Sequence, residues 1–312
     1  MPSTKNIFEY DYFLKVAALG QFPILKITEG EYSQIASSRQ TLSAALNMEE
    51  SYDLAIGNFL DLEKELLLLT AEKVVDHRFD YQRAYELTST LNRRTVNFIL
   101  SGKNYTELIA SKASKCLGSN QQIEETVKLL TNKEYEASLD YRLMEALRNH
   151  VSHSGVAIHK VTNPDRWILD DQKQAKNLVF NIGIYALKSR LAENSKFKKN
   201  VLDELPNDID IKKAVRSYMG AISNIHEEVR KLTKPTIDQA RATVELYLAK
   251  YAEQNDGKAS VVGAYSSALH ASGQKPIMLL LEWDDVRIEL EKKNHSITNI
   301  GKRYVSSSLC AE

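Results

Sequence analysis

The stretch YDLAIGNFLDLEKELLLL, residues 52–69, sets the fold class of this protein. Its apolar side chains recur at spacings of three and four residues, which is the spacing of one face of an α-helix. The members of this apolar stripe are Tyr52, Ile56, Phe59, Leu62, Leu66 and Leu69. A stripe of this length predicts a long amphipathic helix that packs against other helices.

The same spacing recurs in other parts of the chain. Apolar stripes cover residues 84–98, 139–151, 211–229 and 237–251, and shorter ones cover 108–113 and 123–130. Two polar segments, SGKN (101–104) and TKPT (233–236), are expected to end or bend helices between these stripes. We therefore expect a mostly α-helical bundle that extends from about residue 46 to residue 254.

The two ends of the chain have weaker patterns. Residues 1–45 mix short apolar groups with Ser, Thr and Gly, which predicts an irregular N-terminal arm with one or two short strands. The segment EQNDGKAS (253–260) is the clearest boundary. Residues 255–312 then form a C-terminal extension, with a strand expected at 277–283 and a charged helix at 285–293.

The pattern changes between the stripe that ends at residue 151 and the stripe that begins at residue 211. GVAIHKV (155–161) has the character of a short strand, and TNPD closes it. Residues 174–193 are expected to be helical again.

The composition is that of an ordinary soluble protein. The 41 Lys and Arg residues balance 41 Asp and Glu residues, so a nucleic-acid site would have to be a local patch. Cys116 and Cys310 are too few for a disulfide scaffold or a Cys-based zinc site, and they suit a reducing compartment. The amino terminus lacks the apolar core of a signal peptide, and no apolar run is long enough to span a bilayer. We expect a cytoplasmic protein.

The segment YRLMEALRNHVSHSG, residues 141–155, ends one predicted helix in a group of polar side chains. Arg and His side chains near a helix C-terminus interact favourably with the negative end of the helix dipole. Asn, Ser and Gly are common where helices stop. The segment is therefore compatible with an ordinary basic helix end.

The same side chains also have the chemistry for cleaving RNA. Arg148 presents a fork of donors that matches a phosphate, and His153 can take or give a proton near neutral pH. Five residues apart, they would point about 140° from one another around an unbroken helix. They can converge if the helix bends or ends between Val151 and Gly155, and the amide of Asn149 can hold a neighbouring side chain.

On these residues the chain resembles the HEPN superfamily. The family's motif is an Arg, usually followed by a polar residue such as Asn, and then a His after four to six intervening residues. Here these positions are Arg148, Asn149 and His153. The resemblance is specific over residues 141–155 and extends loosely over the helices from about residue 80.

The resemblance implies a helical domain that forms a homodimer, in which the motifs of two chains pair to form a composite ribonuclease site. Arg148, Asn149 and His153 would be the catalytic set, without a cofactor or a metal. It also implies a toxin or a phage-defence effector, with an antitoxin or another defence protein as partner. In toxins silenced by a nucleotidyltransferase antitoxin, a Tyr often follows the motif His, whereas Ser154 follows it here.

A second interpretation stays open: a non-catalytic HEPN-like module that binds RNA or a partner protein, with RNHVSH as a structural helix end. The neutral net charge slightly favours it. His150 lies three residues after Leu147, in register with the apolar stripe, and is expected to be a buried, hydrogen-bonded His.

Other polar groups are less specific. The most basic run, KSRLAENSKFKKN (188–200), is either a solvated surface loop or a contact for RNA phosphates. His159 has no assigned role, and the other histidines have no zinc-ligand spacing among them: His77, His226, His270 and His295.

Overall fold

The computed structural model describes residues 11–76, 80–153, 155–295, 297, 299–300 and 303. Helices account for 64% of the described residues, which confirms the mostly α-helical class. The helices are α1 (Glu29–Glu72), α2 (Tyr81–Cys116), α3 (Gln121–Ala137), α4 (Leu139–His153), α5 (Lys188–Ala192), α6 (Lys199–Glu204), α7 (Ile211–Glu253), α8 (Ser267–Ala271) and α9 (Glu282–Lys293). None of these helices combines the length and the apolar character that a membrane span requires.

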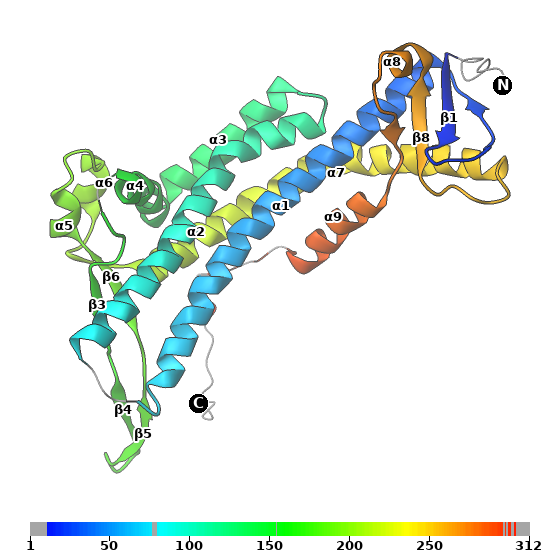
Figure 1. Ribbon diagram of the computed structural model, residues 1–312. Coiled ribbons are helices and arrows are strands. Elements are labelled where there is room, and N and C mark those ends of the chain that lie inside the picture. The colour runs from blue at the N-terminus through cyan, green and yellow to red at the C-terminus, as the bar shows by residue number, and fades with distance from the viewer. Residues whose placement is uncertain are drawn as a thin grey trace. The chain divides into compact units, whose positions relative to one another are not determined.

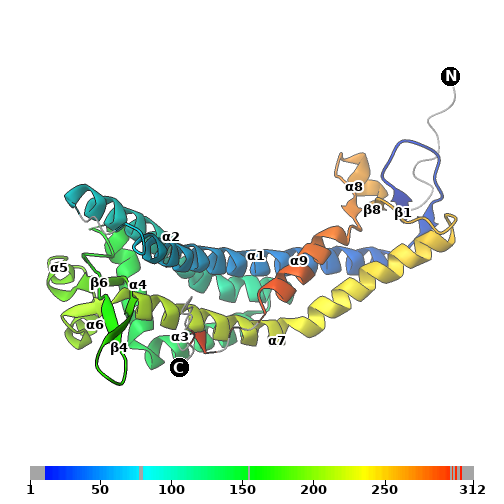
Figure 2. The same ribbon diagram turned by 90° about the horizontal axis from the view of Figure 1, so that it is seen from below.

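Short antiparallel strands complete the secondary structure (Figures 1 and 2). They are β1 (Tyr12–Val16), β2 (Leu25–Lys26), β3 (Lys160–Thr162), β4 (Arg166–Leu169), β5 (Ala175–Val179), β6 (Gly183–Leu187), β7 (Asp208–Asp210), β8 (Val262–Ser266) and β9 (Ile277–Met278). Three residues named above, His77, Ser154 and Cys310, lie outside the described residues.

The chain forms two compact units that alternate along the sequence. The first unit comprises residues 1–50, 109–127 and 228–295, and the second comprises 51–108, 128–227 and 296–312. The predicted division into an arm, a core and an extension, with boundaries near residues 45 and 254, stays a prediction.

In the first unit, the two ends of the chain build one sheet with the strand order β2-β1-β8-β9. The central pair is in register from Tyr12 opposite Ser266 to Val16 opposite Val262. The hydroxyl of Tyr251, in the last turn of α7, accepts a hydrogen bond from the Val16 N–H at 3.3 Å and donates to the Pro23 carbonyl at 2.9 Å. These bonds fix the sheet on α7. The sheet itself confirms that the terminal segments add short strands.

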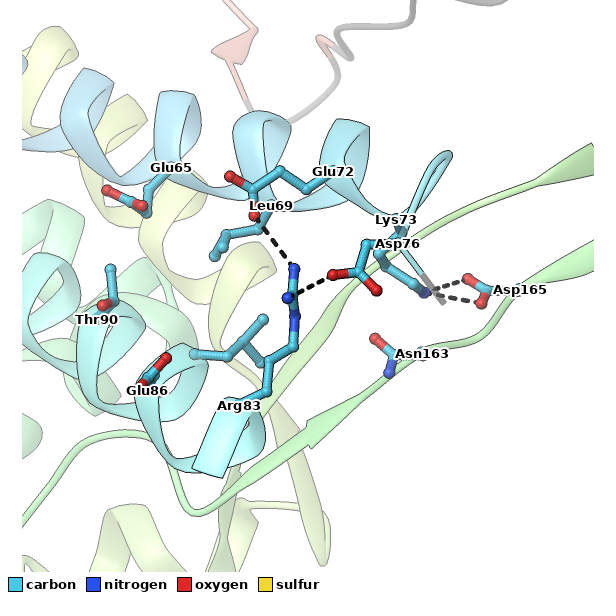
Figure 3. A pocket seen from close by; sticks show the side chains of 11 residues that line it. Glu65, Leu69, Glu72, Lys73, Asp76, Arg83, Glu86, Thr90, Asn163 and Asp165 are labelled. Carbon is cyan, nitrogen blue, oxygen red and sulfur yellow. Dashed lines mark hydrogen bonds and ion pairs between the residues drawn. The ribbon is translucent and has the colours of Figure 1, made fainter. Parts of the chain in front are cut away.

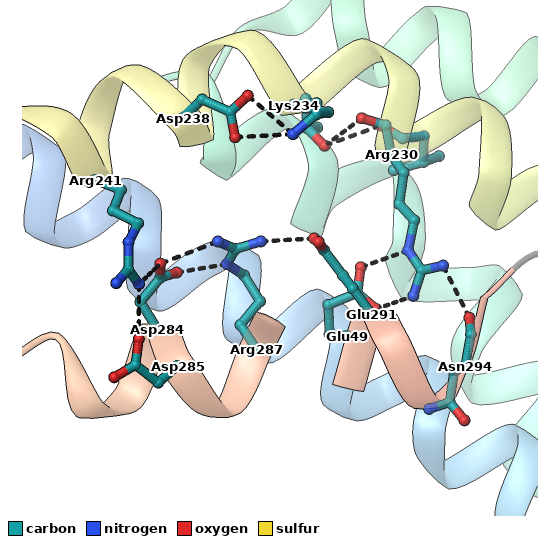
Figure 4. A network of polar contacts seen from close by, with 12 residues as sticks. Glu49, Arg230, Lys234, Asp238, Arg241, Asp284, Asp285, Arg287, Glu291 and Asn294 are labelled. Carbon is teal, nitrogen blue, oxygen red and sulfur yellow. Dashed lines mark hydrogen bonds and ion pairs between the residues drawn. The ribbon is translucent and has the colours of Figure 1, made fainter. Parts of the chain in front are cut away.

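A network of buried charges fixes α9 in the same unit (Figure 4). Arg230 on α7 donates two hydrogen bonds to the carboxylate of Glu49 on α1, at 2.9 and 2.5 Å, and a third to the Asn294 carbonyl. Within α9, Arg287 pairs with Asp284, and Arg241 on α7 reaches the same carboxylate at 2.7 Å. Glu49 and Asp284 are almost fully buried. The pair of Arg241 with Asp284 and the bond from Arg230 to the Asn294 carbonyl therefore join α9 and its C-terminal end to α7.

In the second unit, α1, α2 and α7 pack around a polar aromatic cluster. The ring of His226 stacks on Tyr52 with 3.8 Å between ring centroids. The hydroxyl of Tyr105 and Nδ1 of His226 share a hydrogen bond of 3.0 Å, and Tyr52 donates to Ser223 at 3.0 Å. The hydrogen bonds satisfy polar groups that this core buries.

Two small sheets belong to the second unit. One has the order β3-β6-β7, and the other is the β4–β5 hairpin, which extends away from the helices of its unit (Figures 1 and 2). All four residues of β4 are exposed, including Trp167 at 58%.

Several local expectations were wrong. Residues 29–45 are helical and belong to α1, not to an irregular arm. Residues 174–193 form β5, β6 and only the short helix α5, because β6 pairs with both β3 and β7.

Neither 101–104 nor 233–236 ends a helix, because α2 and α7 run continuously through these segments. Helix α2 continues through Gly102, where an added Cβ would lie 2.7 Å from the Tyr218 ring, so this glycine serves close packing. Helix α7 contains Pro235 and continues to Glu253, and α9 covers the charged helix predicted at 285–293.

Candidate functional site

Helix α4 buries most of its circumference and leaves one polar stripe accessible. The stripe contains Asn149 and His153, both exposed. These two residues are four apart, so their side chains lie about 40° from one another on the same face of the helix. Arg148 is partly covered, with 34% of its side chain exposed.

Asn149 links Arg148 to this stripe. Nη1 of Arg148 donates a hydrogen bond to Oδ1 of Asn149 at 3.0 Å. The Arg148 side chain leaves the helix about 140° from His153, but this bond draws its guanidinium toward the face where His153 lies. Helix α4 continues through His153, and no hydrogen bond joins Arg148 to His153 among the described residues.

A series of alternating charges lies on the other side of Arg148. Its Nη2 is 4.0 Å from a carboxylate oxygen of Glu107 on α2, and Glu107 also faces Lys103 at 3.4 Å. Lys103 pairs in turn with the buried Glu145 on α4. The guanidinium of Arg148 therefore has a carboxylate on one side and an amide on the other.

Glu145 is the buried end of this series. Its Oε1 accepts hydrogen bonds from the Tyr218 hydroxyl at 2.7 Å and from Thr106 at 3.2 Å. Burial and the neighbouring Glu145 charge raise the pKa of Tyr218 well above its ordinary value, so this phenol stays protonated and donates.

His150 is buried and hydrogen-bonded, as predicted. It is 4% exposed, and its Nδ1 accepts a hydrogen bond from the amide of Asn194 at 3.2 Å. Burial lowers its pKa, so the neutral ring is favoured. A Cβ on Gly155 would lie 3.1 Å from its Nε2, which explains the small residue just after the helix.

Asn92 on α2 fixes the chain that follows the motif, and the sequence analysis did not identify it. Its Oδ1 accepts hydrogen bonds from the Ala157 and Ile158 amides at 3.1 and 2.8 Å. Its Nδ2 donates to the Ile158 carbonyl at 3.0 Å. No sequence pattern marks this role, because a helical Asn next to an apolar stripe is common on protein surfaces.

The basic run 188–200 forms α5, the loop after it and the start of α6. It lies against the end of α4, because Asn194 bonds to His150 and the ring of Phe197 meets His150 edge-on at 6.1 Å. Lys196, Lys198 and Lys199 are exposed.

A separate pocket of about 410 Å³ lies in the second unit, between α1, α2 and the β3–β4 connection (Figure 3). Its cations pair with its own carboxylates, Lys73 with Asp165 at 2.6 Å and Arg83 with Asp76 at 2.6 Å. None of Arg148, Asn149 and His153 lines it. The pocket is thus a feature distinct from the polar stripe of α4.

In the part of the chain that the structure describes, no three His, Cys, Asp or Glu side chains form a group that could hold a metal ion. Comparisons with protein-family models, with curated proteins and with solved structures found no match to this chain.

Proposed function

We propose that the end of α4 is a metal-independent endoribonuclease site of the HEPN type. The observation that supports this most is the Arg148–Asn149 hydrogen bond, which turns a phosphate-binding fork toward the exposed face of His153. Both side chains needed for the reaction are accessible to a polymer.

The reaction is transfer of a phosphoryl group within the RNA strand. His153 removes the proton from a 2′-hydroxyl, whose oxygen attacks the adjacent phosphorus. The new O2′–P bond forms, the P–O5′ bond breaks, and the 5′-oxygen leaves with a proton from a second acid. Arg148 donates two hydrogen bonds to the phosphate oxygens as charge builds up. The products are a 2′,3′-cyclic phosphate and a 5′-hydroxyl end.

A second copy of the chain completes this site. A single chain supplies one motif histidine, and the reaction uses a base and an acid. Two α4 ends that meet across a homodimer would supply two histidines and two guanidinium groups. Such an enzyme would act on cytoplasmic RNA as a toxin or defence effector, held in check by an antitoxin or another defence protein.

One observation favours the alternative, a non-catalytic module that binds RNA or a partner protein. Arg148 already has a carboxylate 4.0 Å away in Glu107, which partly neutralises the guanidinium. In that case RNHVSH is a helix end with a stabilising cation.

The test is cleavage of a labelled single-stranded RNA by the purified protein in excess chelator. The proposal expects cleavage with 2′,3′-cyclic phosphate ends, and no cleavage by a His153→Ala protein purified in the same way. The matched variant controls for contaminating ribonucleases. Activity that disappears in chelator and returns with magnesium would refute the mechanism.

A further inference from the structure

The basic run Lys188–Asn200 contains five Lys or Arg residues and a single Glu, in a chain whose net charge is zero. Such a concentration of one sign of charge on a neutral protein creates a local positive potential. The run belongs entirely to the second unit, as does α4.

Contacts on two sides hold this run against α4. The amide of Asn194 and the buried ring of Phe197 pack on His150, one helical turn before His153. Further along, Glu204 at the end of α6 accepts two hydrogen bonds from Arg142, at 2.7 and 2.9 Å. Arg142 lies on the same stripe of α4 as Asn149 and His153, because the three residues are separated by seven and four positions. The run therefore borders the stripe.

Three of its cations are engaged within the protein. Nζ of Lys188 donates to the Asp203 and Leu205 carbonyls at 3.2 and 2.9 Å. Arg190 pairs with Glu193 at 3.2 Å, and Lys198 donates to the Tyr135 hydroxyl at 3.0 Å.

The other two cations are Lys196 and Lys199. Both are exposed, and within the described part of the chain neither ammonium group makes a hydrogen bond or an ion pair. The backbone beside Lys196 is fixed, since its N–H donates to Oδ1 of Asn194 at 3.0 Å. Two charges are thus presented beside α4, Lys196 from the anchored loop and Lys199 from the first residue of α6.

We propose that Lys196 and Lys199 bind backbone phosphates of a single-stranded RNA whose chain passes over the polar stripe of α4. The choice of RNA as ligand rests on the proposed function. A single strand fits because its backbone can adopt the in-line geometry for 2′-hydroxyl attack, and its phosphates bind ammonium groups without regard to base sequence.

The experiment measures binding of a short, fluorescent 2′-O-methyl oligonucleotide, which has the phosphates but cannot be cleaved. Fluorescence anisotropy gives Kd over a range of salt concentrations for the unaltered protein and for the Lys196→Ala/Lys199→Ala variant. The matched control is Lys64→Ala/Lys176→Ala, which removes two exposed lysines from α1 and β5 of the same unit.

If each lysine neutralises one phosphate, the loop variant should bind about 10- to 30-fold more weakly at 0.1 M salt. The slope of log K against log salt should decrease by about 1.4, at roughly 0.7 per contact with a single strand. The control should match the unaltered protein. The inference is overturned if the Lys196→Ala/Lys199→Ala variant has the same Kd and the same salt slope as the control variant. It is also overturned if the unaltered protein does not bind the oligonucleotide.

Poly-aspartate serves as a competitor. Displacement of the oligonucleotide at an equal concentration of charges would assign the loop to an acidic protein partner and overturn the RNA assignment. Because the ligand cannot be cleaved, the two proposals can fail separately. RNA cleavage without any effect of the lysines refutes this inference alone, whereas lysine-dependent binding without RNA cleavage refutes the ribonuclease alone.

Discussion

The amide oxygen of Asn149 accepts a hydrogen bond of 3.0 Å from the guanidinium of its neighbour Arg148. Neighbouring side chains on a helix leave it about 100° apart, so this bond requires the long Arg side chain to reach around the helix. Asn149 therefore holds the guanidinium of Arg148 in position.

Substitution of the three motif residues separates catalysis from structure. We expect Arg148→Ala and His153→Ala each to abolish RNA cleavage. The expected loss is at least about 100-fold, for a missing proton-transfer group at His153 and for a missing stabiliser of the phosphate charge at Arg148. Arg148→Lys should also fail, since an ammonium keeps the charge but loses the fork, and Asn149→Ala should be intermediate. Melting temperatures of all four variants provide the control for folding.

If RNHVSH is only a structural helix end, the same variants should differ in stability rather than in RNA cleavage. Arg148→Lys would then be nearly silent, because either cation suits a helix C-terminus. His153→Ala would lower the free energy of unfolding by about 0.5–2 kcal/mol. Unchanged cleavage in these two variants would rule out the ribonuclease site.

Mixing unaltered and His153→Ala chains tests the composite site. A mixed dimer contains one intact His153, whereas the proposed reaction uses two, one as the base and one as the acid. If the motifs pair across a dimer that includes residues 137–152, subunit exchange with an excess of His153→Ala chains should lower the cleavage activity per unaltered chain. A strictly monomeric mass in light scattering at micromolar concentration contradicts this assembly, as does an unchanged activity per unaltered chain after exchange.

The pair of Arg230 and Glu49 should dominate the stability of the first unit. Arg230→Ala leaves the fully buried Glu49 carboxylate without this cation, at a cost of about 3–5 kcal/mol in the free energy of unfolding. Replacing both residues, as Glu49→Leu/Arg230→Met, should cost much less because no charge is left buried. The measurement is denaturant unfolding.

Lys234→Ala provides the control for this prediction. Lys234 pairs with Asp238 at 2.9 Å on the exposed face of the same helix, and such pairs contribute less than about 1 kcal/mol. Equal losses in Arg230→Ala and Lys234→Ala would show that the buried pair has no special role.

Acid should destabilise the end of α4 through His150 and His159. Burial lowers the pKa of both rings, and for His159 the nearby His150 and Arg190 lower it further while Glu193 opposes them. The unfolded chain then binds more protons than the folded one once the pH falls below about 6.5. The contribution of the two neutral histidines to the free energy of unfolding is fully present above that pH and decreases below it.

The measurement is the change in the free energy of unfolding between pH 7.5 and 5.5. A His150→Gln/His159→Gln variant keeps hydrogen-bonding groups but cannot titrate, so its change should be smaller than that of the unaltered protein. An identical change in both proteins would assign the acid sensitivity to other groups.

Local patterns predicted the long helices, but not all of their ends. The stripe of residues 52–69 lies within α1, yet the helix begins at Glu29, in a segment rich in Ser. A capping box could have shown this start. The Thr28 hydroxyl accepts a hydrogen bond from the Glu31 N–H at 3.2 Å, and the Glu31 carboxylate accepts one from the Thr28 N–H at 2.8 Å.

Contacts between distant segments were not predictable in the same way. Arg148, Asn149 and His153 were selected from one short segment by its resemblance to a family motif, and their assignment as a site stays a prediction. Within one helix, the spacing of residues determines the directions of their side chains. Asn92 and Asn194 act on residues more than forty positions away, and the β6 strand gains its hydrogen bonds from β3 and β7. Such pairing depends on the folded chain and has no local period.

Within the second unit, the exposed β4–β5 hairpin should open locally much more often than the helices. A two-stranded ribbon with little buried surface is only marginally stable, so amides from Arg166 to Val179 should exchange with deuterium long before those of the helices. A protease should cut first at the turn around Gln172, and the cut protein should keep its helices. The same turn is then the place where a fluorophore or an inserted tag would disturb the rest of the molecule least.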